Sequence, residues 1–279
     1  MKTLEIEKKR ICVFYHYFEA SEIYTENLKY FLEHSYSEEL DFNICISGEC
    51  SIDLPFKKNI QYHYVKNLNN DYGAYCTILP KIFKNNHYGH YIFINCSTRG
   101  PFLKPGSKRK WYQHFINLLV DDVHLGGSSI NMLSSKSRFI RNLPKIKGAY
   151  SHVQTSSYCL TREAVEFLIK DGFYYISDQL SKSEVITHYE IGLSQRILKN
   201  NWNFSCLLEK YQHLDFRKQP NDINPTSKRG DPLYKKAYFG KTVEPEEVIF
   251  IKTHARRRLI KTTTNYKLFD SLKKIIKCY

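Results

Sequence analysis

The alternation of strand-like and helix-like segments is the feature that most constrains the fold of this chain. Ile11–Tyr17 is an apolar, β-branched and aromatic run typical of a buried strand. A helical stripe of apolar residues follows it: Tyr24, Leu28, Phe31 and Leu32. Three more runs read as strands: Phe42–Ser47, Ile60–Val65 and Tyr91–Cys96. This rhythm predicts an α/β fold with a Rossmann-like, mostly parallel sheet that helices cover on both faces.

The later part of the chain continues this pattern less regularly. Thr161 is a good N-cap for an apolar helix that ends at Asp171-Gly172, and Thr187 with Glu190 forms a capping-box pattern that opens another helix. Two further runs predict strands: Asn203–Leu208 and Val248–Lys252. A polar, Pro- and Gly-containing stretch, 212–247, lies between them and predicts a long irregular excursion.

The charge of the chain is concentrated near its C-terminus. The 279 residues carry 42 Lys and Arg against 28 Asp and Glu, a formal net charge of +14. Nine of these basic residues and only one acidic residue lie from Lys252 onward. Most aromatic residues sit inside the strand-like runs instead of alternating with basic residues. This distribution argues against a surface built for nucleic acid.

The apolar runs and the cysteines indicate the cellular setting. No run reaches the roughly 20 apolar residues that a membrane helix needs, and the charged first ten residues have no apolar region behind them. Eight cysteines lie mostly within apolar runs and form no Cys-x-x-Cys pair. We therefore expect a protein of the reducing cytoplasm without a zinc or redox motif.

Small polar segments follow the predicted strands, where ligands of parallel α/β sheets bind. These segments are Gly48–Cys50, Asn69–Gly73 and Asn95–Pro101. The chain contains no GxxxxGK[ST], GxGxxG, HExxH or GxSxG motif. Phosphoryl transfer, Rossmann-type redox chemistry and serine hydrolysis are thus disfavoured.

Two of these segments resemble one family of enzymes. The phrases NNDYGAY (Asn69–Tyr75) and YIFINCSTRGPF (Tyr91–Phe102) are similar to the motifs of rhamnan-synthesis-type glycosyltransferases, which include single-domain bacterial and algal-virus enzymes. The closing phrase PEEVIFIKT (Pro245–Thr253) is also similar. The resemblance implies one GT-A-like domain over residues 1–253, with a donor half at about 1–125 and an acceptor half at about 126–253. Residues 254–279 would form a basic amphipathic helical tail.

The resemblance implies that the donor half binds a nucleotide-diphosphate sugar, with UDP as the expected carrier. Asp71 would lie near the nucleotide sugar, on a turn where Gly73 allows close approach; the alternative is an Asx-turn or a helix N-cap. Asn95-Cys96-Ser97 occupies the place of the usual Asp-x-Asp, which binds Mn²⁺ or Mg²⁺. Neutral Asn95 and Ser97 are poor ligands for these cations, so no cofactor is assigned and Mn²⁺ or Mg²⁺ stays an open alternative. Arg99 could bind phosphate instead, or form a salt bridge within its loop.

The resemblance also implies residues that face the acceptor. Glu190 is the candidate catalytic base for transfer with inversion, with Asp178 and Glu184 as substitutes. Its alternative role is the second member of the capping box. The run from His152 to Leu160 predicts a strand whose alternation places His152 and Gln154 on one face, suited to acceptor hydroxyls. The alternative is that they are satisfied polar residues on an exposed face. Tyr189 is a further acceptor-binding candidate. His254 is a weak candidate for a metal or phosphate ligand.

The expected reaction is transfer of a sugar to a carbohydrate acceptor. Rhamnose, xylose or another deoxyhexose or pentose are the donor sugars that the resemblance suggests. Two other functions are open: a non-catalytic sugar-binding relative and a basic nucleic-acid-binding protein. The basic tail could also hold the protein against an anionic membrane surface, although the sequence favours a solvated helix face as the explanation.

Overall fold

The computed structural model describes residues 10–134, 136–140, 143, 150–176 and 178–253. It contains a seven-stranded sheet in the order β10-β6-β9-β4-β1-β2-β3 and two small two-stranded sheets, β11-β5 and β7-β8. The strands are β1 Ile11–Phe18, β2 Leu40–Ser47, β3 Ile60–Val65, β4 His90–Asn95, β5 Thr98–Arg99, β6 Val123–Gly127, β7 Ile130–Leu133, β8 Tyr150–Val153, β9 Ser157–Thr161, β10 Asn203–Cys206 and β11 Ile251–Lys252.

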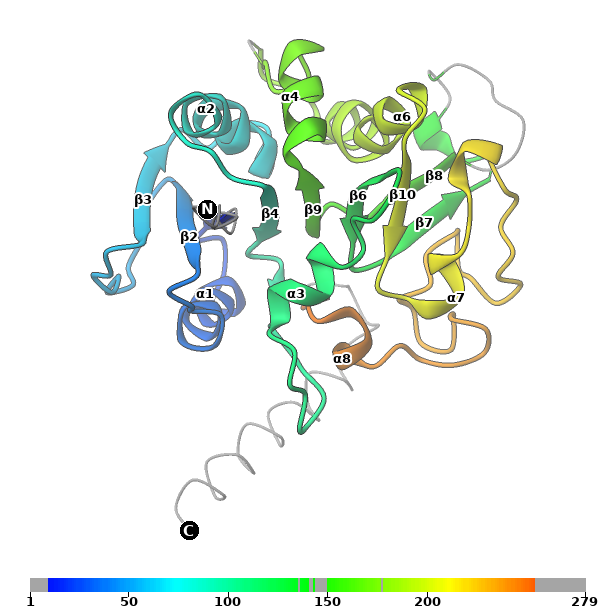
Figure 1. The fold of residues 1–279 in the computed structure, drawn as a ribbon, viewed down its shortest axis with the longest axis horizontal. Helices are drawn as coiled ribbons and strands as arrows, with labels where there is room; N and C mark the ends of the chain where they lie inside the picture. The colour runs from blue at the N-terminus through cyan, green and yellow to red at the C-terminus, as the bar shows by residue number, and fades with distance from the viewer. Residues whose placement is uncertain (1–9, 135, 141–142, 144–149, 177, 254–279) are drawn as a thin grey trace, which may run out of the picture.

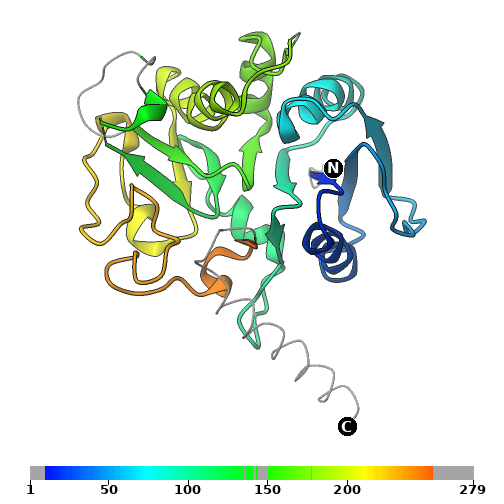
Figure 2. The same cartoon turned by 180° about the vertical axis from the view of Figure 1, so that it is seen from behind.

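Helices cover both faces of the large sheet, as the alternation predicts (Figure 1; Figure 2). One face carries α1 and α3, and the other carries α2, α4 and α6. The helices are α1 Glu22–His34, α2 Asn70–Asn85, α3 Trp111–Ile116, α4 Arg162–Lys170, α5 Lys182–Val185, α6 Gly192–Lys199, α7 Glu209–Gln212 and α8 Pro245–Val248. The mostly parallel α/β architecture is therefore confirmed; in the large sheet only β9 runs antiparallel to its neighbours.

Alternating side chains of the central strands point to opposite faces of the sheet and pack into two aromatic cores. Val13 and Tyr15 of β1 pack with α1 and α3, whereas Phe14 packs with α2. The Phe14 ring stacks on Phe93 at 5.2 Å between ring centres, and Phe93 stacks on Tyr158 at 4.7 Å. Burial of such rings is a large favourable term in folding, and their offset contacts add to it. The aromatic residues of this chain thus serve mainly as core.

The strand order has a switch point between β1 and β4. The chain passes from β1 outward through β2 to β3, then returns and places β4 on the other side of β1. His16 at the end of β1 pairs in register with Asn95 at the end of β4. The connections after β1 and before β4 lie on opposite faces of the sheet, and the carboxyl ends of strands at such a switch point are where α/β proteins commonly bind ligands.

Several predicted segments differ from the structure. The expected strand from His152 to Leu160 is interrupted at Gln154–Ser156, so β8 and β9 belong to different sheets. Val248–Lys252 is only partly a strand, because Pro245 starts a short helical turn and only Ile251 and Lys252 pair with β5. The predicted tail at 254–279 lies outside the described residues. The division into halves at about residue 125 stays a prediction.

The capping box expected at Thr187 and Glu190 is wrong. The helix begins earlier, where Ser181 and Glu184 form the capping box, and it runs continuously into a π-helical turn at Ile186–Ile191. The Thr187 hydroxyl donates to the carbonyl of Phe139 instead. Thr187 and Glu190 match the capping-box pattern, but Ser181 and Glu184, six residues upstream, match it equally well, and the helix begins there. In contrast, Thr161 caps α4 as predicted, accepting from the Ala164 N–H at 3.2 Å.

Gly73 is required for packing of the α2 N-terminus. A Cβ at this position would lie 1.9 Å from the carbonyl oxygen of Leu68, which is backbone and cannot move away independently. We predict that Gly73→Ala lowers the free energy of unfolding by about 3 kcal/mol or more, in line with other severe overpacking changes. Chemical denaturation followed by circular dichroism measures this difference.

Gly192→Ala is the matched control for Gly73→Ala. Gly192 is also helical, but its Cβ would meet only the mobile end of Arg196 at 3.1 Å and the Thr187 carbonyl at 3.4 Å. Because Ala favours helix over Gly, we expect this variant to stay within about 1 kcal/mol of the parent. Equal losses in the two variants would contradict the steric account of Gly73.

Candidate functional site

The candidate site lies at the carboxyl ends of β1 and β4, beside the first turn of α2. Asn69 and Asn70 enter this turn with left-handed backbone angles, φ 54° and 56°, which Asn tolerates better than most residues. The Asn69 side chain donates to the Asp178 carbonyl at 2.8 Å and accepts from the Leu180 N–H at 2.7 Å. The NND segment therefore ties α2 to the chain that precedes α5.

Asp71 lies in the first turn of α2 rather than on an open turn, and it is buried. Its Oδ2 accepts from Asn95 Nδ2 at 3.0 Å. The N-cap of the helix is Asn69, so Asp71 is not the capping residue that the structural alternative supposes. Burial raises the pKa of Asp71 to about 6, although the Asn95 hydrogen bond opposes this shift.

Asn95 and Ser97 are partly buried and bonded to each other. Asn95 Oδ1 accepts from the Ser97 hydroxyl at 2.5 Å and from its N–H at 3.2 Å. Asn95 Nδ2 donates to Asp71, so both the nitrogen and the oxygen of the Asn95 amide are hydrogen-bonded. The carboxyl end of β4 is thereby fixed to α2, as the predicted donor site requires.

These residues do not fit a divalent cation. Mg²⁺ and Mn²⁺ favour several carboxylate or free carbonyl oxygens. Here the Asn95 oxygen already accepts two hydrogen bonds, and Asp71 is the one carboxylate among these three residues, with a raised pKa. Within the described residues no three His, Cys, Asp or Glu side chains are grouped closely enough to hold a metal ion. His254 lies outside those residues.

Arg99 faces α1 and is engaged there. Its Nε donates to Asn27 Oδ1 at 2.9 Å, and its Nη2 forms an ion pair with Glu26 at 2.7 Å. The side chain of Arg99 is only 8% exposed. Arg99 is therefore salt-bridged, as the alternative supposes, but to helix α1 and not within its own loop. The donor-binding role of Arg99 stays a prediction, and it would require a phosphate to compete with Glu26.

Glu190 approaches the same site from the π-helical turn. A π-helical turn inserts an extra residue into the helical repeat and shifts the following side chains, a device common at functional sites. The Glu190 side chain is partly buried, and burial raises the pKa of its carboxyl group. The charges of Lys252 and Lys182 lower it, and Glu190 in turn raises the pKa of Asp71. Asp71 and Glu190 thus share one electrostatic environment.

The two substitutes for Glu190 are less suited to a buried site. Glu184 is exposed and its carboxylate accepts from the Ser181 N–H, which completes the capping box. Asp178 is also exposed, and its carbonyl accepts from Asn69. Of the three predicted base candidates, only Glu190 acts electrostatically on Asp71. The catalytic role itself stays a prediction.

The predicted acceptor residues divide into different environments. His152 is buried on β8 and burial lowers its pKa to about 4, so it is neutral at pH 7. Gln154 is buried in the turn after β8, where Nε2 donates to Asn131 at 2.7 Å and to Asp231 at 3.0 Å. Tyr189 packs on Tyr72, with ring centres 4.9 Å apart. Their acceptor roles stay predictions.

Sequence reasoning missed two residues at this edge of the sheet. His16, buried at the end of β1, shares a 2.9 Å hydrogen bond with Ser47, and burial lowers its pKa to about 4. Lys252 on β11 acts electrostatically on Asp71, Glu190 and His152. A lysine that ends the apolar run VIFI was the available signal, but no local pattern connects it to Asp71.

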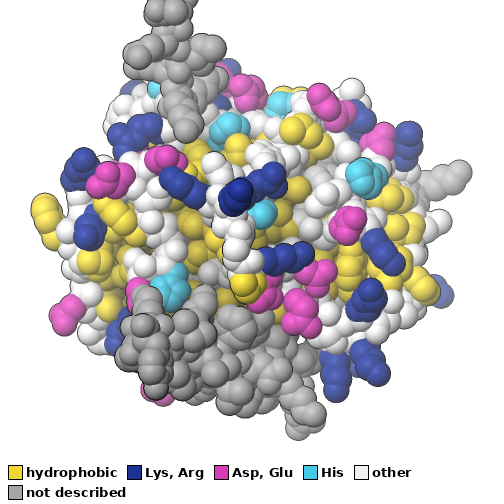
Figure 3. All heavy atoms as spheres, turned by 60° about the horizontal axis from the view of Figure 1, so that its bottom comes forward, with side chains coloured by type: hydrophobic (Ala, Val, Ile, Leu, Met, Phe, Trp, Pro, Cys, Tyr) yellow, Lys and Arg dark blue, Asp and Glu magenta, His cyan; other side chains and the backbone are white. Residues whose placement is uncertain are grey.

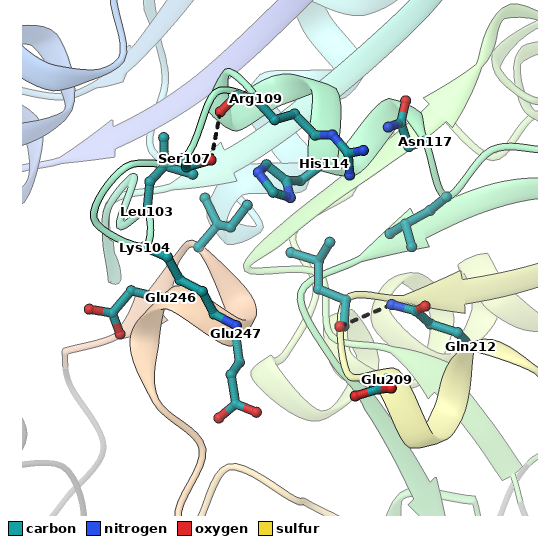
Figure 4. Close-up of a pocket in the computed structure, with 13 residues that line it drawn as sticks. Leu103, Lys104, Ser107, Arg109, His114, Asn117, Glu209, Gln212, Glu246 and Glu247 are labelled. Carbon is teal, nitrogen blue, oxygen red and sulfur yellow. Dashed lines mark hydrogen bonds between the residues drawn. The ribbon is translucent and has the colours of Figure 1, made fainter.

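A separate pocket of about 380 Å³ opens beside α3 (Figure 4). Lys104 lies beside Glu247 on one side of it, Arg109 extends from the start of α3, and Glu209 lies across from them near Gln212. Its apolar floor includes Leu207 and Ile249, which belong to the core under α1 and α3. None of the predicted site residues lines it. The pocket is therefore distinct from the site around Asp71.

Comparison with known proteins finds no matching family model and no matching curated protein. Many solved structures are similar, and three of them are as follows. A glycosyltransferase involved in glycosylation of the PBCV-1 major capsid has a TM-score of 0.44 and 12% identity, covering 89% of this chain and 96% of that one. TarS 1–349 of S. aureus has a TM-score of 0.40 and 11% identity, covering 72% of this chain and 59% of that one. The mannosyltransferase PcManGT of Pyrobaculum calidifontis, solved with GDP-Man and Mn²⁺, has a TM-score of 0.41 and 10% identity. The match covers 71% of this chain and 54% of that one.

These values describe remote similarity in overall shape. At identities of 10–12% and TM-scores below 0.5, they transfer no residue role, metal or substrate to this chain. No helix among the described residues is both long and apolar enough to cross a membrane.

The buried Asp71 should destabilise the folded protein at neutral pH. Its pKa is raised from 3.8 to about 6, so the folded state holds this proton more tightly than the unfolded state. Its contribution to stability is therefore fully present below about pH 4 and is lost as the pH rises toward 6. We predict that Asp71→Asn gains on the order of 2–3 kcal/mol relative to the parent between pH 4 and pH 7.5.

Urea unfolding of both proteins at the two pH values measures this difference. A variant that becomes relatively less stable as the pH rises would show that the carboxylate is stabilising when ionised, contrary to this assignment. If the Asp71→Asn variant is more stable than the parent protein but no longer binds ligand, Asp71 is a residue retained for function.

Proposed function

We propose that this protein is a GT-A-type glycosyltransferase that moves a sugar from a nucleotide-diphosphate donor to a glycan acceptor with inversion. The observation that carries the proposal is the convergence of Asp71, Asn95 and Glu190 at the switch point of a parallel sheet, where α/β proteins bind nucleotides. The resemblance of the NNDYGAY and YIFINCSTRGPF phrases supports the same assignment.

The chemistry needs one proton acceptor and a site for a departing diphosphate. Glu190 would take the proton of an acceptor hydroxyl as that oxygen attacks the anomeric carbon. The bond from this carbon to the diphosphate breaks, and the diphosphate leaves with the electron pair. Asp71, Asn95 and Ser97 would orient the donor. A carboxylate with a raised pKa is a stronger base than an exposed one, which suits this role.

The donor is proposed to be a UDP-type sugar, with rhamnose, xylose or a related sugar as the transferred group. The expected setting is the cytoplasm. Nucleic-acid binding is less well supported. The largest fully buried side chains are all aromatic, so these rings pack in the core and cannot stack on bases. On the face seen in Figure 3, acidic and basic side chains also intermingle instead of forming one basic patch.

Glu190→Gln tests the proposed base. The amide keeps the shape and polarity of the side chain but cannot accept the acceptor proton. We expect a folded variant with nearly unchanged melting temperature, retained donor binding and a turnover reduced by about 10²–10⁴-fold. Sugar transfer from a panel of nucleotide sugars to oligosaccharide acceptors, quantified by mass spectrometry, provides the rates.

Glu184→Gln is the matched control, since Glu184 serves the capping box of the same helix. Gln also functions in a capping box, so this variant should transfer sugar at nearly the parent rate. Normal turnover in Glu190→Gln, or a product that retains the anomeric configuration of the donor, would contradict the mechanism. Donor binding without transfer or hydrolysis by the parent protein would identify a non-catalytic relative.

The pH profile of the reaction should show the raised pKa of Glu190. Because the base acts when ionised, the rate should fall on the acid side at a pH above 4.5, the ordinary pKa of the group. The charged groups acting on Glu190 are Lys252 and Lys182, and its charge acts on Asp71. Initial rates from pH 4 to pH 9 measure this limb. A rate independent of pH down to 4.5 would exclude Glu190 as the base.

A further inference from the structure

Among the groups at the candidate site, Lys252 combines a positive charge with a fixed backbone position. Lys252 pairs in register with Thr98, and the N–H of the next residue, Thr253, donates to the Ser97 carbonyl at 2.9 Å. The Asn27 side chain bridges the Cys96 carbonyl and the Thr253 hydroxyl, each at 2.8 Å. Strand β11 is thereby fixed against the segment that follows β4.

The ammonium group of Lys252 acts on groups from three different elements. Its charge lowers the pKa of Asp71 on α2, of Glu190 on the π-helical turn and of His152 on β8. Lys252 is partly buried, and no carboxylate of the described residues lies within ion-pair distance of it. Its charge therefore acts on all three groups, and no ion-pair partner among the described residues neutralises it.

The other candidate cations at this edge of the sheet are unsuited to bind a phosphate. His16 and His152 are neutral at pH 7, because burial lowers the pKa of each to about 4. Arg99 is committed to Glu26 and Asn27 on the α1 side. The Asp71, Asn95 and Ser97 set does not fit a divalent cation, for the reasons given above. A diphosphate at this edge still requires positive charge. Lys182 is exposed and acts on Glu190, whereas Lys252 is partly buried and acts on both Asp71 and Glu190.

We propose that Lys252 holds the diphosphate of the donor and that this site binds nucleoside diphosphates without a divalent cation. The proposal rests on the proposed function, because it assigns the donor site of the same reaction. A lysine ammonium is a compact point charge that binds phosphate well. As the sugar transfers, the bond from the anomeric carbon breaks and negative charge grows on the diphosphate oxygen, close to this fixed cation.

Binding of nucleoside diphosphates by the chelated protein tests the proposal. Isothermal titration with UDP, GDP, dTDP and inorganic pyrophosphate is performed in EDTA and again with Mn²⁺. We expect the parent protein to bind at least one nucleoside diphosphate in EDTA, within about threefold of its affinity with Mn²⁺. Lys252→Met should weaken this binding about 10- to 100-fold in both conditions, and Lys252→Arg should restore part of it.

Lys182→Met is the matched control, because Lys182 is an exposed lysine that also acts on Glu190. It should bind nucleoside diphosphates like the parent protein. The Lys252 side chain makes no hydrogen bond or ion pair within the described residues, so Lys252→Met should keep the parent melting temperature. A folded Lys252→Met variant with unchanged affinity overturns the proposal, as does binding that EDTA abolishes and Mn²⁺ restores.

The same experiment separates this inference from the proposed function. Sugar transfer that needs Mn²⁺ and is insensitive to Lys252→Met overturns the Lys252 assignment while the glycosyltransferase stands. Metal-free binding that depends on Lys252, without any transfer or donor hydrolysis, supports the diphosphate site and refutes the enzyme. A parent protein that binds none of the four probes in either condition overturns the inference.

Discussion

The hydrogen bond between Asp71 and Asn95 is the contact on which the candidate site depends. It joins the first turn of α2 to the end of β4, and Asn95 passes the constraint on to Ser97. The carbonyl of Ser97 then receives the N–H and hydroxyl of Thr253, which positions Lys252. This series of hydrogen bonds thus connects α2, β4 and β11. Such a network is rigid when every member is bonded.

This network has an energetic cost that a purely structural role does not explain. A buried carboxyl with a raised pKa disfavours the folded state near neutral pH. A second carboxyl, Glu190, lies in the same environment and raises that pKa further. The helix presents Glu190 through a π-helical turn, which is less favourable than a regular α-helical turn. Features that oppose stability and converge on one place are characteristic of functional sites.

Local sequence patterns predicted the layers of the fold and pointed to residues that meet at one edge of the sheet. The four leading strands match β1 to β4 within two residues at each end, and Thr161 caps α4 as expected. Residues placed after the strands by the pattern, Asp71 and Asn95, do meet at the carboxyl edge. What failed depended on competition or long-range contact. The helix begins at an earlier cap, Ser181, instead of Thr187. Lys252 acts electrostatically on Asp71 from a strand that is placed by its pairing with β5, a contact between distant parts of the chain.

Hydrogen–deuterium exchange with and without saturating nucleoside diphosphate tests most directly whether ligand binds at the switch point. The account predicts added protection in peptides that cover Ser97–Arg99, the π-helical turn and Ile251–Thr253, with little change elsewhere among the described residues. Protection confined to the pocket beside α3, in peptides containing Arg109 and Glu247, would contradict it, because that pocket shares none of the residues assigned to the donor.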